Sequence, residues 1–221
     1  MPDHTAGTAR GLAAARTAIE TEAAAVLALA GRIDGVFLDV LAAVAQCEGH
    51  LVVTGLGKSG LVGRKIAATL ASTGTPATFI HAADALHGDS GAVTRRDIVL
   101  ALSASGETAE VCAFARMLAE RDIPVIAMTG GEKSTLARLA TYTLDTMVLR
   151  EADPLNLAPT ASTTAALVMG DALACALVAW RDFTQTDFAR FHPSGALGRR
   201  LLGDELGDEL GDEDGEELGD D

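Results

Sequence analysis

The spacing of hydrophobic residues divides the chain into a helical N-terminal part and a longer part in which the pattern alternates. Residues 8–30 are rich in Ala, Glu and Leu and contain no Gly or Pro after Gly11, which predicts a long helix. Over residues 33–47 apolar side chains recur every three or four positions, as on one face of a second helix. We expect these two helices to form an additional packing or oligomer surface.

Beyond residue 50 the apolar residues form short continuous runs, most of them separated by segments with helical spacing. The five predicted strands are Leu51–Thr54, Ala77–Ile80, Ile98–Leu102, Val125–Thr129 and Tyr142–Val148. Strands that alternate with helices form parallel sheets covered on both faces. The pattern therefore predicts an α/β fold, a three-layer αβα sandwich with a five-stranded parallel sheet of doubly wound type.

The C-terminal part is expected to be helical first and then without fixed structure. A long Ala- and Leu-rich helix is predicted over residues 160–181, and a shorter one near 184–191 leads to His192. The last residues repeat Gly-Asp-Glu-Leu with small variations and show no core-forming pattern. We expect three parts: an N-terminal helix over 1–30, one domain over 31–202 and a disordered acidic tail over 203–221.

The net charge of −14 is concentrated in that tail. Residues 203–221 hold 11 acidic residues and no basic ones, which leaves 20 acidic against 17 basic residues in the rest of the chain. The predicted domain is thus nearly neutral and has no basic stripe, so nucleic acid is not an expected partner.

Cysteine usage and the N-terminus bear on location. Cys47, Cys112 and Cys175 are isolated, without the CxxC or Cys/His spacing of a zinc site, and we expect buried reduced thiols. The first ten residues lack the apolar core of a signal peptide, and no run of 18 apolar residues occurs. A cytoplasmic protein without a membrane partner is expected.

The loop Gly55–Gly60 follows the first predicted strand, where ligands of parallel sheets bind. Its glycines and the start of the next helix suit an anion. The loop is not a nucleotide P-loop, because GxxxxGK[ST] is absent. It formally matches the dinucleotide fingerprint GxGxxG, but Phe79-Ile80-His81 stands where that motif needs an acidic residue. Alone this loop is ambiguous.

Two further loops carry many hydroxyl groups. Ser103–Thr108 follows the third strand and offers three hydroxyls with the open amides of a helix start, which suits a phosphate monoester; an ordinary N-cap is the alternative. Residues Thr160–Thr164 place four hydroxyls at the start of the long helix, more than capping needs, and a sugar would use the surplus.

Several segments together resemble one known family, the sugar isomerase (SIS) domain, and within it the D-arabinose 5-phosphate isomerases. The resemblance runs from about residue 30 to residue 202, and its motifs are Gly57–Gly60, Ala71–Pro76, His87–Asp89, Ser103–Thr108, Leu157–Thr164, Val168–Leu173 and His192–Gly198. It implies a flavodoxin-like fold and interconversion of D-arabinose 5-phosphate and D-ribulose 5-phosphate for 3-deoxy-D-manno-octulosonate (Kdo), a component of lipopolysaccharide or capsule. It also implies a homotetramer.

Carried over by position, the resemblance also implies the site residues. The implied catalytic residues are Lys58, Glu110, Glu151 and His192. The implied substrate contacts are Ser59, Gly74, Thr75, His81, His87, Ser103, Ser105 and Thr108. No cofactor is implied, and a zinc ion at His81 would inhibit rather than catalyse.

The chemistry fits these residue types. Moving a carbonyl between C1 and C2 through an enediol needs a carboxylate base and donors for the developing oxyanion. Glu110 and Glu151 both qualify as the base, and the sequence does not decide between them. Lys58 and His192 would serve as electrophile and acid, and His192 follows a terminal helix that would reach a neighbouring subunit.

The chain departs from the family pattern in two places, and two other functions stay open. The acidic tail stands where many members carry CBS regulatory modules, and the usual His-Pro-Gly-Gly reads His192-Pro193-Ser194-Gly195. The alternatives are a regulatory SIS module that only binds a sugar phosphate and an SIS isomerase of a hexulose 6-phosphate. A sensor would need no base, so the four implied catalytic residues favour an enzyme.

Overall fold

A computed structural model describes residues 4–192 and shows the parallel sheet that the sequence predicts. Its strands are β1 (Leu51–Gly55), β2 (Ala77–His81), β3 (Ile98–Leu102), β4 (Val125–Thr129) and β5 (Tyr142–Asp145). All pairings are parallel, in the order β2-β1-β3-β4-β5. The predicted fold class is confirmed, while the predicted tail 203–221 lies outside the described residues and the domain boundaries stay predictions.

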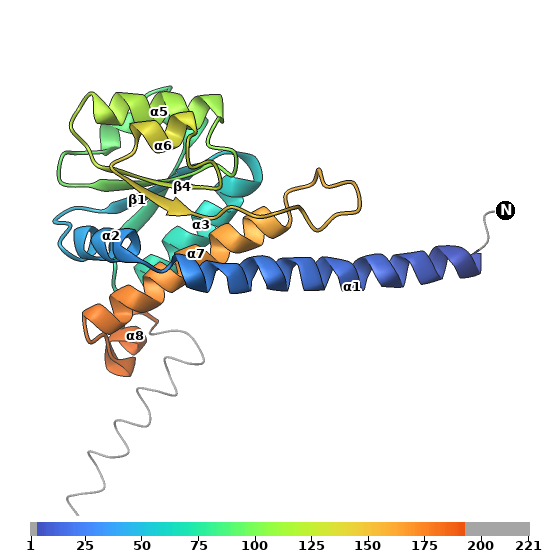
Figure 1. Ribbon diagram of the computed structural model, residues 1–221. Helices are drawn as coiled ribbons and strands as arrows, with labels where there is room; N and C mark the ends of the chain where they lie inside the picture. The colour runs from blue at the N-terminus through green and yellow to red at the C-terminus, as the bar shows by residue number, and fades with distance from the viewer. Residues whose placement is uncertain (1–3, 193–221) are drawn as a thin grey trace, which may run out of the picture.

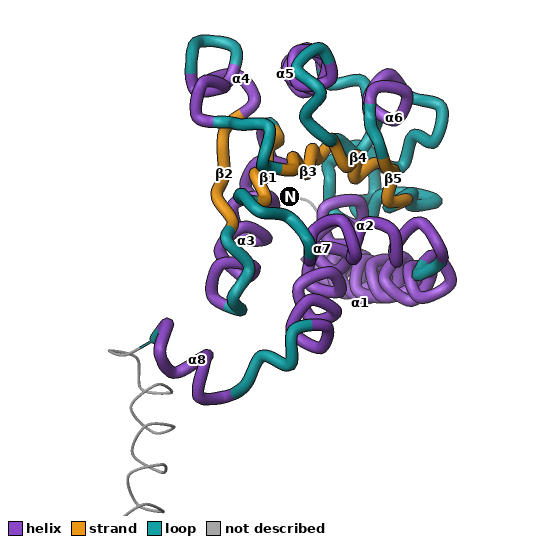
Figure 2. The backbone as a smooth tube through the Cα atoms, turned by 90° about the vertical axis from the view of Figure 1, so that its left-hand side faces the viewer, coloured by secondary structure: helices purple, strands orange, loops and turns teal. Residues whose placement is uncertain are grey.

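Helices cover both faces of the sheet, as Figure 2 shows. One face packs against α2 (Gly35–Ala45), α3 (Gly57–Ser72) and α7 (Ala161–Trp180), and the other against α4 (Ala82–Ala85), α5 (Ala109–Ala119) and α6 (Thr135–Leu139). Every residue of β1, β3 and β4 is buried. Because both faces are covered, these strands read in the sequence as continuous apolar runs rather than as alternating ones.

The N-terminal helix α1 (His4–Leu29) starts earlier than expected. It packs along α7, and its first half projects beyond the rest of the molecule (Figure 1). A short 3-10 turn, η1 (Ala30–Arg32), joins it to α2. Helix α2 begins at Gly35 rather than at the predicted residue 33, because Asp34 is its N-cap: Oδ1 accepts hydrogen bonds from the amides of Val36 (2.9 Å) and Phe37 (3.2 Å).

Strand β5 ends three residues before the predicted Val148. The amide of Met147 donates to Oδ1 of Asp145 at 2.8 Å, so that the chain turns away from the sheet. Arg32 from η1 then donates to the carbonyl of Met147, also at 2.8 Å, and pairs with the Asp145 carboxylate. A side-chain hydrogen bond, which hydrophobic spacing does not report, therefore sets the end of this edge strand.

Helix α7 is apolar because it lies in the interior of the fold. By length and composition it is the one helix among residues 4–192 that would be able to cross a membrane. Its buried residues recur every three or four positions and face α3 and the sheet, while α1 packs on another side. These contacts account for its composition.

The end of the sheet opposite the predicted ligand edge is held together by a buried carboxylate. Asp97 is 5% exposed and accepts hydrogen bonds from the amides of His50 (2.7 Å) and Thr94 (2.6 Å) and from the Thr94 hydroxyl (2.8 Å). Burial raises the pKa of Asp97, but the hydrogen bonds from His50 and Thr94 outweigh it, and the pKa lies below its ordinary value.

Replacing Asp97 by Asn is therefore expected to lower the free energy of unfolding by about 1–3 kcal/mol at neutral pH, because buried donors lose a charged acceptor. A carboxylate with a lowered pKa stabilises the fold above its unfolded pKa of about 3.9, and this contribution disappears as the pH falls through the folded value. Urea unfolding of both proteins should show their difference shrinking below about pH 4. Asp122→Asn, at a side chain 83% exposed, is the control; an equal effect there would contradict the assignment.

Candidate active site

The carboxyl ends of β1, β3, β4 and β5 bring four loops together on one edge of the sheet. A pocket of about 240 Å³ lies between them and is lined by Ala104, Ser105, Gly130, Gly131, Thr146, Met147, Val148, Glu151 and Ser162. A narrower cleft continues from it, shares Ala104, Thr146 and Ser162, and adds Ser59 and Ser103. We call both together the site pocket. It joins four of the predicted residues: Ser59, Ser103, Ser105 and Glu151.

The Ser103–Thr108 loop is held in one conformation by Gly106. Its φ is +69°, and its amide donates to the carbonyl of Ser103 at 3.0 Å. A Cβ at this position would lie 2.0 Å from Oγ of Ser134, so only glycine fits. The carboxylate of Glu107 then accepts the amide of Thr135 at 2.8 Å, which ties the loop to the start of α6 and lowers the pKa of Glu107.

The same loop presents open backbone amides to solvent. Within residues 4–192 no acceptor pairs with the amides of Ala104, Ser105 or Thr108. The hydroxyls of Ser103 and Thr108 lie 2.8 Å apart and are hydrogen-bonded to each other, while Ser105 Oγ accepts the amide of Glu107. The loop thus offers mainly backbone amides, the groups that bind phosphate at helix starts.

Glu151 lies on the loop between β5 and α7 and is held at the start of α7. Its Oε2 accepts hydrogen bonds from the Thr160 amide (2.8 Å), the Thr160 hydroxyl (3.1 Å) and the Ser162 amide (3.1 Å). Burial raises the pKa of Glu151, but hydrogen bonds from Ser162 and Thr160 outweigh it, so the pKa is lowered. The Ser162 hydroxyl helps lower this pKa, although it makes no hydrogen bond of good geometry with any described residue.

Lys58 and Glu110 approach this edge from opposite faces of the sheet. Lys58 is exposed in the first turn of α3, on the side of α7. Glu110 is half-buried in the first turn of α5, in the other helical layer, and does not line the site pocket. Neither side chain has an ion pair within the described part of the chain. Glu151, and not Glu110, shares a pocket with the Ser103–Thr108 loop.

The histidines His81 and His87 lie beyond β2. His81 ends that strand, pairs in register with Gly55, and places Nδ1 3.9 Å from Oδ2 of Asp84. His87 is exposed in the turn after α4. No group of three or more His, Cys, Asp or Glu side chains within residues 4–192 is placed to hold a metal ion. A zinc ion at His81 stays a prediction.

Gly74, Thr75 and His192 lie away from the site pocket in one copy of the chain. Gly74 and Thr75 precede β2 and therefore lie at the amino edge of the sheet, where Arg181 donates to the Gly74 carbonyl and to the buried Thr75 hydroxyl at 2.6 Å. His192 follows α8 (Gln185–Phe191) at the far end of α7 (Figure 1), and its ring stacks on Phe188 at 4.0 Å. Their roles in substrate binding and catalysis stay predictions.

The structure adds residues that the motifs did not single out. Gly130 and Gly131 line the site pocket after β4, and a glycine pair directly after a predicted strand was a visible signal. Thr160 holds Glu151, whereas Thr164 turns away and donates to Glu22 of α1 at 2.8 Å. Helical spacing does not distinguish these two threonines, because their partners come from other segments.

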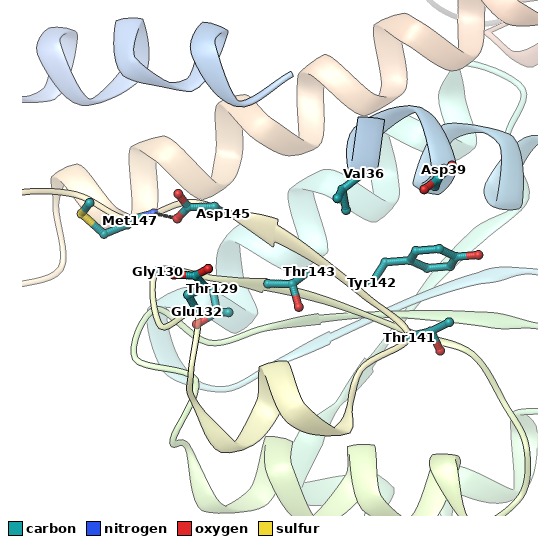
Figure 3. Close-up of a pocket in the computed structure, with 10 residues that line it drawn as sticks. All are labelled: Val36, Asp39, Thr129, Gly130, Glu132, Thr141, Tyr142, Thr143, Asp145 and Met147. Atoms are coloured by element: carbon teal, nitrogen blue, oxygen red, sulfur yellow. Dashed lines mark hydrogen bonds between the residues drawn. The ribbon is translucent and has the colours of Figure 1, made fainter. Parts of the chain in front are cut away.

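A larger pocket lies elsewhere, along the edge strand β5. It has about 760 Å³, and Figure 3 shows it between α2 and the loop after β4, with Asp39, Tyr142 and Glu132 at its walls. It contains none of the predicted site residues. It borders the site pocket at Gly130 and Met147, which line both, but it extends along β5, away from the β1 and β3 loops.

Comparisons with known proteins agree on one family. The SIS domain model matches residues 45–176. Arabinose 5-phosphate isomerase KdsD of Pseudomonas aeruginosa is 53% identical over 188 residues, which cover 85% of this chain and 58% of that relative. The protein of the same name from Escherichia coli K12 is 56% identical over 156 residues, which cover 71% of this chain and 48% of that relative. The chain thus spans about half the length of the curated relatives it matches.

Solved structures show the same likeness over nearly their whole length. A protein of E. coli CFT073 in complex with arabinose 5-phosphate has a TM-score of 0.79 and 38% identity, and the match covers 84% of this chain and 98% of that one. A putative sugar-phosphate isomerase of Listeria monocytogenes has a TM-score of 0.79 at 28% identity, and the match covers 83% of this chain and 96% of that one.

Proposed function

The chain belongs to the SIS domain family, and on that basis we propose that it is an aldose–ketose isomerase that interconverts D-arabinose 5-phosphate and D-ribulose 5-phosphate. The names of the relatives and the solved complex with arabinose 5-phosphate support this substrate. The observation that carries the proposal is that open amides and a carboxylate share one pocket: Ser105 and Glu151 both line it. A phosphate and a sugar carbon would meet these two groups at the same time.

The reaction requires only proton transfers. A carboxylate removes the proton from C2 of the open-chain aldose, and a donor protonates the carbonyl oxygen on C1, which gives the enediol. The hydroxyl on C2 then loses its proton, and C1 gains one, which gives the ketose. We propose Glu151, which lines the site pocket, as the base and Lys58, in the first turn of α3, as the donor at the oxyanion. No electrons leave the sugar, so we propose that no cofactor is required and that zinc, if bound at His81, inhibits.

The setting of the enzyme follows from the same proposal. We infer a cytoplasmic homotetramer whose product supplies Kdo synthesis for lipopolysaccharide or capsule, with neither nucleic acid nor membrane as partner. Exposed apolar side chains on α1, namely Leu12, Ile19 and Leu27, support assembly through this helix. A neighbouring subunit would then also supply His192, which lies far from the site pocket of its own chain.

The proposal is tested by a coupled assay of purified protein with arabinose 5-phosphate, ribose 5-phosphate and glucose 6-phosphate side by side. We expect turnover of the first and at least a hundredfold lower kcat/KM for the others, on the order of the rejection a polar site gives a wrong isomer. Tight binding of one sugar phosphate without turnover of any would contradict the enzyme and favour a sensor. Preferred turnover of glucose 6-phosphate, whose ketose product is a hexulose 6-phosphate, would contradict the proposed pentose substrate.

A further inference from the structure

The hydrogen bonds to Glu151 are unevenly divided between its two oxygens. All three donors meet Oε2, two of them from Thr160 and one from the amide of Ser162. Oε1 has no hydrogen-bond partner among residues 4–192, although Glu151 lines the site pocket. One oxygen therefore anchors the side chain, and the other is left for a ligand.

Thr160 connects both sides of this loop to the carboxylate. Its Oγ1 accepts the amide of Ala152 at 2.8 Å, directly after Glu151, and lies 3.1 Å from Oε2 and 3.2 Å from the carbonyl of Ala158. A hydroxyl has a single proton to donate, and an ionised oxygen is the stronger acceptor. The proton therefore belongs to the bond with Glu151.

The loop has further supports that do not involve Thr160. Asn156 accepts the amide of Glu151 at 2.6 Å, and the carboxylate of Asp153 accepts the amides of Leu155, Leu157 and Ala158 at 2.7–2.9 Å. Because these bonds hold the backbone, removal of one hydroxyl should change the orientation of the Glu151 side chain rather than unfold the loop.

We propose that Thr160 is the positioning residue of the isomerase reaction: its amide and hydroxyl fix Oε2 of Glu151, so that Oε1 is the oxygen presented to the C2 proton. This inference rests on the proposed function, because a base is needed only if the chain catalyses isomerisation. Thr160 itself touches the carboxylate and not the reacting carbon.

No other charged or titratable side chain of the described chain lines the pocket of about 240 Å³ beside the Glu151 carboxylate. On its own loop, Arg150 donates to the backbone carbonyl of Glu151 at 3.2 Å, and Asp153 is engaged by backbone amides. On the packed helices α7 and α1, Glu22 accepts the Thr164 hydroxyl and Asp171 pairs with Lys65. Burial and hydrogen bonds therefore determine the ionisation of Glu151.

The test compares Thr160→Val with Thr160→Ser in the arabinose 5-phosphate assay. Val keeps the shape and the amide but loses the hydroxyl, so we expect kcat to fall roughly 10- to 100-fold with KM nearly unchanged. Since the lost bond stabilises the ionised carboxylate, the pKa of Glu151 rises and the acid limb of the kcat profile moves to higher pH. Ser should restore kcat and the profile. Thr164→Val is the matched control, because it removes a hydroxyl of the same helix start that donates to Glu22 of α1; it should retain both the wild-type kcat and the pH profile.

A second readout does not depend on turnover. In ¹³C-glutamate-labelled protein, with Glu151 assigned by Glu151→Gln, the Cδ titration should show a higher pKa in Thr160→Val than in the wild type and no change in Thr160→Ser. An unchanged kcat or an unchanged titration in Thr160→Val overturns the proposal. If Thr160→Val does not fold, Thr160→Ala is held to the same two criteria. A wild type without turnover would refute the proposed function, whereas the titration would still decide whether Thr160 controls Glu151.

Discussion

Glu151→Gln is expected to reduce kcat for arabinose 5-phosphate roughly 10²- to 10⁴-fold, the range attributed to general acid–base catalysis, with a small change in KM. The amide has nearly the shape of the carboxylate, and its oxygen is able to accept the amides of Thr160 and Ser162 as Oε2 does. Its NH₂ group then takes the place of Oε1, and an amide nitrogen cannot remove a proton. Loss of exchange between solvent deuterium and the C2 proton is the direct measurement.

Glu110→Gln is the matched change at the other predicted carboxylate. Because Glu110 lies in the opposite helical layer and outside the site pocket, we expect the larger loss of deuterium exchange from Glu151→Gln. A larger loss from Glu110→Gln would move the base to α5. Unchanged exchange in both variants would contradict the assignment of the base to either residue.

Gly106→Ala is expected to raise KM and the Kd for inorganic phosphate at least about tenfold. An alanine at φ +69° costs roughly 1–3 kcal/mol in strain, and a factor of ten in affinity corresponds to about 1.4 kcal/mol. In addition, the new Cβ would lie 2.4 Å from Cβ of Ser134, so the loop must shift away from α6. The open amides of Ala104 and Ser105 would then no longer converge.

Calorimetric titration with phosphate and steady-state kinetics measure this effect. Gly91→Ala is the control, because no atom lies within 4 Å of the position of its Cβ. Wild-type phosphate affinity in Gly106→Ala would show that the phosphate does not bind at Ser103–Thr108. A comparable loss in the control would show that the effect is not specific to the loop.

The sheet, and the edge at which its Gly- and Ser-rich loops gather, were predictable from sequence because both depend on local patterns. Buried parallel strands such as Ile98–Leu102 are continuous apolar runs, and the loops after them carry Gly and Ser. The family resemblance is confirmed by the SIS domain match over residues 45–176. The ends of elements differed, as at Asp34 and Asp145, where a side chain bonds to a nearby amide, and the short helix α4 was not predicted.

The internal arrangement of the site was less predictable, because it depends on contacts between distant segments. The motif around Gly74 and Thr75 indicates substrate binding, but its place before β2 puts it at the amino edge, where Arg181 engages it. Glu151 and Thr160 meet across a loop whose hydrogen bonds no periodicity reports. The same holds for His192: its place in the motif is read from the sequence, but which pocket its side chain enters depends on how copies of the chain assemble.

The hydrogen bonds that hold Glu151 also make the two ends of the site pocket electrostatically different. Helices α5 and α7 are two of those that begin at this edge of the sheet, and each start favours negative charge. At α7 that place is already taken by a carboxylate of the protein itself, whereas at α5 the amides of the Ser103–Thr108 loop remain open. Under the proposed function, we expect a molecule with an anionic end and an uncharged reactive end to bind with its anionic end toward α5 and its reactive end toward α7. The difference between the two helix starts would thus select the orientation of such a molecule before any contact with the sugar hydroxyls is made.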